Sequence, residues 1–207
     1  MKQFRILVFS SFIFLGFALF SYLVDKDIFT QFDFDTTVRL QDNLSRRFDE
    51  PFSFFSDIGN FEPMLILLVI ILVLRRKLWG IIVLGLFGLF HVVELYGKFF
   101  VDHLPPPEFM LRTKHLIEFP MFHVRSEFSY PSGHTGRAAF LTVLIGFLVA
   151  RSKKLKQTQK IFIISILAIY DIVMFTSRVY LGEHWTSDVI GGGLLGVSLG
   201  LLAGFML

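Results

Sequence analysis

The sequence predicts an all-α integral membrane protein, built as a six-helix bundle with interfacial amphipathic helices in its first outer loop. Hydrophobic residues make up 54% of the 207 residues and the mean hydropathy is +0.64, which is more apolar than soluble domains usually are. Six apolar segments also approach or exceed the roughly 20 residues that cross about 30 Å of hydrocarbon as a helix. These segments are residues 4–24, 59–74, 78–100, 132–150, 161–181 and 185–207.

The first segment could be mistaken for a secretory signal peptide, but two features favour an uncleaved membrane anchor. Its apolar stretch, residues 6–24, is long for the hydrophobic part of a signal peptide, and no small-x-small pattern precedes Asp25. The second segment, residues 59–74, is the shortest. Because there is no internal repeat and no soluble domain boundary, residues 1–207 are expected to form a single transmembrane domain.

Two polar loops differ in character. Residues 101–130 contain the run Pro105-Pro106-Pro107, which cannot continue a helix, so this loop is expected to form part of the rim of a site. Residues 31–60 interleave charged and apolar side chains, which predicts one or two amphipathic helices at the membrane interface. The apolar positions of this pattern are Phe32, Val38, Leu44, Phe48 and Phe52.

The basic residues set the orientation, because short loops rich in Lys and Arg stay in the cytoplasm. Three such pieces contain no Asp or Glu: residues 2–5, 75–77 and 151–160. Both termini are therefore predicted to be cytoplasmic, in what we expect to be a bacterial cytoplasmic membrane. The net charge of +3 is carried in short clusters between apolar runs, a pattern that does not favour nucleic acid as a partner.

This topology brings three polar clusters to the extracytoplasmic face. One is Lys98 at the end of the third span, the second is the run 131–134 at the start of the fourth, and the third is residues 177–188 between the fifth and sixth.

The run Pro131-Ser132-Gly133-His134 suits an anion site. Serine is a favoured N-cap, and a helix N-terminus presents unpaired N–H groups and positive dipole to an anion. Gly133 permits close approach of the backbone, and a histidine beside a phosphate can act as a general acid. An ordinary capped helix is the alternative interpretation, which His134 makes less attractive.

His184 and Asp188 lie four residues apart, so on a helix the carboxylate reaches the imidazole. A carboxylate bonded to one ring nitrogen fixes the tautomer and leaves the other nitrogen free to attack. Such a pair is also common at surfaces, but Arg178 nearby could bind phosphate oxygens in a bidentate fork. Lys98 adds a cation, although alone it would be interpreted as a lysine extending to the headgroups.

Together these residues resemble the type-2 phosphatidic acid phosphatase superfamily, which also includes vanadium haloperoxidases. The family's Pro-Ser-Gly-His block matches in full at 131–134, and its Ser-Arg-x5-His-x3-Asp block matches in full at 177–188. The Lys-x6-Arg-Pro block matches only in part. Lys98 is present, but Pro105 stands where the arginine is expected.

The resemblance implies a role for each residue. His184 would be the nucleophile that forms a phosphohistidine, Asp188 would orient it, and His134 would protonate the leaving oxygen. The groups implied to hold the phosphate oxygens are Lys98, Ser132, the Gly133 amide and Arg178. For the missing arginine, Arg112 in the Pro-rich loop is the hypothesised substitute, and Arg125 is the other candidate.

The function implied by the resemblance is an extracytoplasmic-facing membrane lipid phosphatase that uses no metal and no cofactor. Its substrate would be a lipid phosphomonoester or diphosphate: phosphatidate, phosphatidylglycerophosphate or a polyprenyl diphosphate such as undecaprenyl diphosphate. One alternative is a vanadate-dependent haloperoxidase-like enzyme. Another, motivated by the missing arginine, is a catalytically weakened membrane protein that binds lipid phosphate.

Several ionisable residues lie outside these blocks. Glu94 is four residues before Lys98 and is expected to pair with it, and Arg137 either lines the site or extends to the headgroups. Asp171 lies mid-span and is expected to face the bundle interior, as a functional group or a packing contact. The outer-loop group of His103, His115, His123, Asp102 and Glu108 matches no metal signature.

Overall fold

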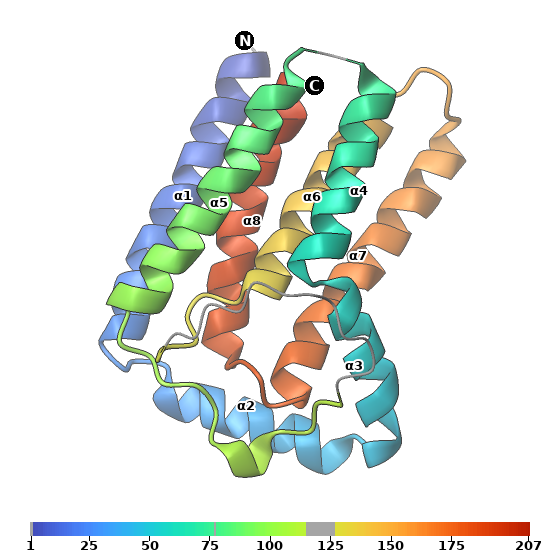
Figure 1. The fold of residues 1–207 in the computed structure, drawn as a ribbon. Coiled ribbons are helices and arrows are strands. Elements are labelled where there is room, and N and C mark those ends of the chain that lie inside the picture. Colours follow the sequence, from blue (N-terminus) through green and yellow to red (C-terminus); the bar gives the residue numbers. More distant parts are fainter. Residues whose placement is uncertain (1, 77, 115–126) are drawn as a thin grey trace.

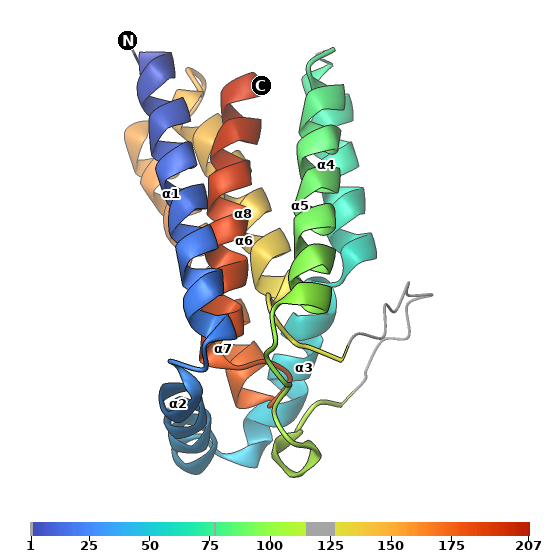
Figure 2. The same ribbon diagram turned by 90° about the vertical axis from the view of Figure 1, so that its left-hand side faces the viewer.

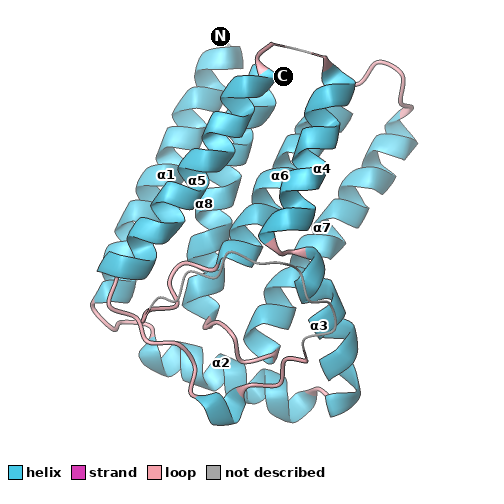
Figure 3. Cartoon of the chain, in the orientation of Figure 1, coloured by secondary structure: helices cyan, strands magenta, loops and turns pink. Residues whose placement is uncertain are grey.

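The computed structural model describes residues 2–76, 78–114 and 127–207, and within these ranges the secondary structure is entirely helical (Figure 3). The long helices are α1 (Lys2–Asp25), α4 (Phe61–Arg75), α5 (Gly80–Phe100), α6 (Gly133–Arg151), α7 (Gln157–Tyr180) and α8 (Thr186–Met206). Two shorter α-helices, α2 (Thr30–Asn43) and α3 (Asp49–Ile58), precede α4, and single 3-10 turns occupy Arg46–Phe48 and Glu108–Met110.

The long helices run side by side as a bundle, with the two termini at the same end (Figures 1 and 2). At the opposite end α2 lies across the bundle and α3 stands beside it. The expected bundle with amphipathic helices in its first outer loop is therefore confirmed.

The six predicted spans correspond to the six long helices, with one qualification at the second. Five helices, α1, α5, α6, α7 and α8, are long and apolar enough to cross a membrane on their own. The sixth, α4, has only 15 residues, and it reaches span length only together with the preceding segment Arg46–Ile58, from which it is bent by 49°. The predicted span 59–74 is thus the second helix of a bent pair, and only the pair together reaches the length of a span.

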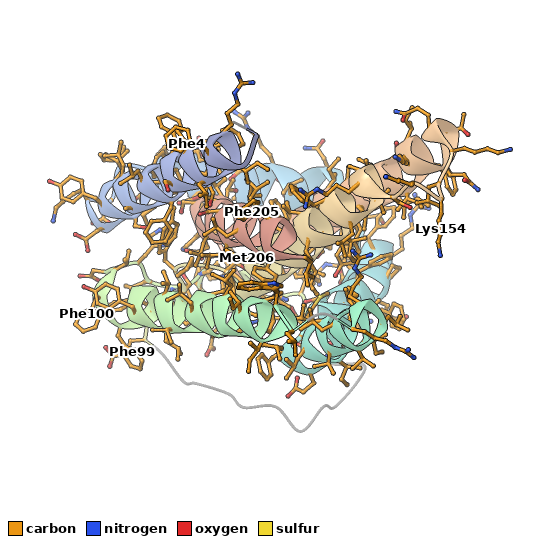
Figure 4. All side chains as sticks on the ribbon, turned by 90° about the horizontal axis from the view of Figure 1, so that it is seen from above. Phe4, Phe99, Phe100, Lys154, Phe205 and Met206 are labelled. Atoms are coloured by element: carbon orange, nitrogen blue, oxygen red, sulfur yellow. The ribbon has the colours of Figure 1, made fainter. Side chains whose placement is uncertain are left out.

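The outer surface of the bundle is apolar, as a bilayer requires. Seen from above, Phe4 and Phe100 lie at the rim of the bundle, whereas Phe205 and Met206 lie near its middle (Figure 4). Phe4 is 71% exposed and Phe100 66% exposed. Aromatic groups so exposed would be unfavourable in water and are accommodated by lipid.

Close packing of α6 on α8 brings the second and third sequence clusters together. A Cβ atom at Gly196 would lie 2.2 Å from the carbonyl oxygen of Gly136, and one at Gly192 would lie 2.2 Å from that of Ser132. Small residues allow membrane helices to approach backbone to backbone. At the end of this contact the Ser132 amide donates a 3.0 Å hydrogen bond to the backbone oxygen of Asp188.

The interfacial helices are fixed to the bundle by polar contacts. The buried carboxylate of Asp33 in α2 accepts hydrogen bonds from the amide and hydroxyl of Ser187, at 2.7 and 2.6 Å. Near α3, the Tyr180 hydroxyl donates to Asp49, at 2.6 Å. The first outer loop therefore contacts the turn that carries the third cluster.

The mid-span carboxylate of Asp171 makes a helix-packing contact. Its Oδ2 accepts a 2.7 Å hydrogen bond from Thr142 of α6, and Asp171 is not among the residues that line the cavity described below. Of the two interpretations made from the sequence, the geometry favours packing.

The α6–α8 contact yields a prediction. Replacing Gly196 by Ala should lower the thermal midpoint of the detergent-solubilised protein by roughly 5 °C, because overpacking a tight contact costs about 1–3 kcal/mol. Gly146→Ala is the matched control, since a Cβ atom there meets nothing within 4 Å, and it should be neutral or slightly stabilising. Equal midpoints for the two variants would contradict this packing.

Candidate active site

A cavity of about 550 Å³ opens at the end of the bundle where α2 and α3 lie, and the three sequence clusters converge on it. Five of the predicted site residues line it: Lys98, Gly133, His134, Arg178 and His184. Two more, Ser132 and Asp188, are fully buried directly behind the lining. The sequence prediction that these clusters share one face is supported by this arrangement.

The pair His184–Asp188 has the geometry of an oriented nucleophile. His184 Nδ1 lies 3.2 Å from Asp188 Oδ2, and the same oxygen accepts the backbone N–H of Trp185 at 3.0 Å. An N–H at Nδ1 places the lone pair on Nε2, which makes no hydrogen bond with the part of the chain that the structure describes. His184 therefore offers a free ring nitrogen to the cavity.

Burial keeps the His184 imidazole neutral. Desolvation lowers the pKa of His184 below its ordinary value, even though the Asp188 carboxylate acts in the opposite direction. At neutral pH the ring is thus unprotonated at Nε2, which is the form that can attack phosphorus.

His134 is held by a residue that the sequence analysis did not identify. Its Nε2 lies 2.8 Å from Asn60 Oδ1, and because an amide oxygen only accepts, Nε2 carries the proton. Asn60 comes directly before α4. A polar residue next to an apolar run on the outer face was the available signal, but its partner could not be known without the fold.

Two buried donors at the site have no hydrogen-bond partner among the described residues. Arg178, 2% exposed, donates from its two terminal nitrogens to Ser56 and Glu183, while its Nε has no partner among the described residues. The fully buried Ser132 hydroxyl is likewise unpartnered within the described ranges. Unsatisfied buried donors are costly, so such groups are typical of a site that receives an acceptor-rich ligand.

Arg137 lines the cavity instead of extending to the headgroups. It is 7% exposed, and its Nε donates a 3.0 Å hydrogen bond to the backbone oxygen of Gly59. Its Nη1 lies 3.6 Å from Glu94 Oε2. Together with Lys98 and Arg178 it gives the cavity three cationic side chains.

The hypothesised substitute for the missing arginine lies elsewhere. The Arg112 guanidinium sits 5.1 Å from the ring centroid of Tyr180, and its backbone N–H donates to Leu181 at 2.9 Å. Arg112 is not among the residues that line the cavity. The other candidate, Arg125, falls outside the described residues.

Carboxylates accompany the cations. Glu94 accepts from His91 Nδ1 at 2.9 Å and faces Arg137. Its charge also interacts with Lys98, the partner that the sequence suggested. Glu183 contacts Arg178 and Thr113. Burial alone would raise the pKa of Glu183, but the Arg178 charge holds it below the ordinary value.

A second histidine contacts Asp188. His103 Nδ1 lies 2.9 Å from Asp188 Oδ1, and its Nε2 lies 3.6 Å from Asp33 Oδ2. In the sequence, His103 is one of three loop histidines, and this group matches no metal signature. His115 and His123 lie outside the described residues, and within the described ones no group of three or more His, Asp or Glu side chains could hold a metal ion.

Among known protein families, the model described as the PAP2 superfamily matches residues 64–204 of this chain. Phosphatidylglycerophosphatase B of Bacillus subtilis (strain 168) is 29% identical over 145 residues, which cover 70% of this chain and 64% of that protein. The aligned part therefore spans slightly less than two thirds of that curated relative.

Two solved structures share the fold. The crystal structure of the first transmembrane PAP2-type phosphatidylglycerolphosphate phosphatase, from Bacillus subtilis, has a TM-score of 0.76 at 24% identity, over 94% of this chain and 93% of that one. The structure of Aquifex aeolicus LpxE has a TM-score of 0.62 at 22% identity, over 83% of this chain and 94% of that one. Because the family model covers more than half of the sequence, this chain belongs to the PAP2 superfamily.

Proposed function

We propose that this protein is a membrane lipid phosphatase that hydrolyses a lipid phosphomonoester or diphosphate on the extracytoplasmic face of a bacterial membrane. One observation carries the proposal. A neutral imidazole, oriented through Nδ1 by a buried carboxylate, shares one cavity with a second imidazole and three cations. That combination supplies a nucleophile, an acid and charge stabilisation for phosphoryl transfer.

The reaction would proceed in two steps. His184 Nε2 attacks phosphorus and the bond to the leaving oxygen breaks. His134 acts as the acid in its imidazolium form: its Nε2–H stays bonded to Asn60, and the proton on Nδ1 passes to the leaving oxygen, which leaves His134 neutral. Water then attacks the phosphohistidine, gives a proton to His134, and releases inorganic phosphate and free His184. Asp188 keeps the nucleophile in one tautomer throughout.

The cations bind the phosphate and stabilise the charge that builds on its oxygens. Arg178 has an unpartnered Nε and Ser132 an unpartnered hydroxyl, and both suit equatorial phosphate oxygens. Arg137 takes the place of the missing arginine at Pro105, because among the described residues it is the additional guanidinium that lines the cavity.

The basic residues indicate how the protein is oriented in the membrane, and the lining of the cavity indicates how a lipid could enter it. The basic segments at the C-terminal end of α4 and between α6 and α7 lie at the end of the bundle that carries the termini, opposite α2 (Figure 1). By the distribution of Lys and Arg, that end is cytoplasmic and the cavity is outside. Phe61 of α4 and Leu95 of α5 line the cavity, so a lipid tail can remain against apolar helix surface while its phosphate enters.

The similarity to phosphatidylglycerophosphatase B of Bacillus subtilis favours phosphatidylglycerophosphate as the first substrate to test. Phosphatidate and undecaprenyl diphosphate are the alternatives, because the site described above binds the phosphate and not the rest of the lipid. No metal or cofactor takes part in the proposed steps.

Purified protein in detergent should release inorganic phosphate from at least one of these lipids in the presence of EDTA. His184→Ala should lower the rate by at least about 10³-fold, because no other group replaces the nucleophile. Gly146→Ala controls for the effect of substitution on the helix bundle. A fully active His184→Ala protein would falsify the assignment of His184 as the nucleophile.

Two other outcomes would favour the alternative functions. Bromide oxidation with added vanadate, without phosphate release, would favour a haloperoxidase. Tight binding of phosphate without turnover would favour a binding protein.

Arg137 and Arg112 can be separated by substitution. Arg137→Gln should lower kcat/KM by about 10²-fold, the typical loss of one donor to a transition-state charge, whereas Arg112→Gln should change it less than about threefold. Adding Pro105→Arg to the Arg137→Gln protein should restore part of the loss. The reverse ranking, with Arg112→Gln the damaging change, would assign the third cation to Arg112.

A further inference from the structure

We infer that His103 is a positioning residue for the nucleophile, whose imidazole bridges Asp188 and Asp33 and thereby keeps His184 in its neutral, attacking form. The inference rests on the proposed function, in which His184 is the nucleophile. It adds the loop after α5 and the interfacial helix α2 to the machinery of the site.

The geometry places one imidazole on each oxygen of the Asp188 carboxylate. His184 Nδ1 lies 3.2 Å from Oδ2 and His103 Nδ1 lies 2.9 Å from Oδ1. Asp188 is fully buried and His103 is 6% exposed, so water does not compete for either contact. His103 is not among the residues that line the cavity, and it acts through Asp188.

The other edge of the His103 ring faces a second carboxylate. Its Nε2 lies 3.6 Å from Oδ2 of Asp33, which is 2% exposed. Asp33 is held in place by the amide and hydroxyl of Ser187, at 2.7 and 2.6 Å. An imidazole between two carboxylates presents an N–H to each of them only when it is protonated at both nitrogens.

Charge compensation favours that protonated form. Two carboxylates buried side by side are strongly unfavourable without a cation between them. Burial by itself would lower the pKa of His103, but the contacts with Asp188 and Asp33 raise it to about 9. At neutral pH His103 is therefore an imidazolium.

This positive charge matters for His184. A buried carboxylate favours a proton on any imidazole it contacts, and a proton on Nε2 would remove the lone pair that attacks phosphorus. With His103 on the opposite oxygen, part of the Asp188 charge is already balanced. Asp188 can then orient the His184 ring while His184 Nε2 stays unprotonated.

The backbone anchor of His103 is separate from its side chain. The His103 carbonyl oxygen accepts the amide of Ser129 at 3.0 Å and its hydroxyl at 3.2 Å. Substituting the imidazole leaves both bonds available, so the side chain can be tested without releasing the loop.

The test compares His103→Gln with His103→Lys, because Gln removes the charge and Lys keeps it. In ¹⁵N-histidine NMR of the detergent-solubilised protein, the protonation midpoint of His184 should move upward by about one pH unit in His103→Gln. It should move less in His103→Lys. The His184 resonance is assigned by its loss in His184→Gln. An unchanged midpoint in His103→Gln overturns the inference.

Activity supplies an independent measurement. The acid limb of kcat/KM should move upward with the NMR midpoint, and kcat should fall about tenfold or more while KM changes little, because the nucleophile and not the phosphate site is affected. Ionisation of the substrate is common to all variants and cancels in the comparison. Ser187→Ala is the control: it removes one bond to Asp33 but no charge, so the limb should stay in place. An equal shift in Ser187→Ala would assign His103 a purely structural role.

The phosphatase proposal and the inference about His103 can be refuted independently of each other. If no lipid is hydrolysed but the NMR midpoint of His184 still responds to His103, the phosphatase proposal fails and the positioning of His184 stands. If lipid is hydrolysed and neither the midpoint nor the acid limb responds, only the inference about His103 fails.

Stability provides a final prediction, with a definite sign. A pKa raised from 6.5 to about 9 stabilises the folded protein fully below pH 6.5, and this contribution is lost as the pH rises through about 9. The groups that interact with His103 are Asp33 of α2 and Asp188 of α8, while His184 and Lys98 interact with Asp188 in turn. The thermal midpoint of the wild type should fall toward that of His103→Gln between about pH 7 and 10. A constant difference across this range would contradict an imidazolium at position 103.

Discussion

The buried carboxylate of Asp188 is the interaction on which the site depends. One oxygen holds His184 at 3.2 Å, the other meets His103 at 2.9 Å, and the backbone oxygen of the same residue accepts the amide of Ser132 at 3.0 Å. A buried charge must be compensated by well-placed partners, and these partners come from different segments of the chain. The carboxylate is therefore satisfied only when the turn before α8 and the loop after α5 are assembled, and the backbone bond to Ser132 ties the same residue to the start of α6. Correct folding and the orientation of the His184 ring are thus one condition.

The bilayer explains why so much of this assembly is polar or small. Helices in lipid gain little from burying apolar side chains against one another, so close backbone approach and polar contacts hold them. Gly136 and Gly196 allow α6 and α8 to meet, and Asp33 ties α2 to the start of α8. The interfacial helices are thus part of the site, and they do more than cover it. Within the cavity each guanidinium faces a carboxylate, Arg178 with Glu183 and Arg137 with Glu94, which lowers the cost of keeping cations buried before an anion arrives.

Much of the molecule could be predicted from local patterns. Apolar run length located the six long helices, because a span needs a nearly continuous apolar stretch, and helical spacing paired His184 with Asp188. The bend between α3 and α4 was missed, because 15 apolar residues look like a short span until the direction of the preceding helix is known. Arg112 was the hypothesised substitute for the missing arginine because of its place in the Pro-rich loop. The fold instead turns Arg112 onto Tyr180 and Arg137 into the cavity.

The sequence by itself determined the helical membrane class, the family blocks and the chemical types at the site, because each of these depends on residues close together in the chain. Only the tertiary structure decided which distant side chains meet: Asn60 with His134, Arg137 with the other residues of the cavity, and His103 between Asp33 and Asp188. These contacts join residues 70 or more positions apart, or depend on how one helix is rotated against another. No local periodicity encodes such pairings, because they arise from the packing of the whole bundle.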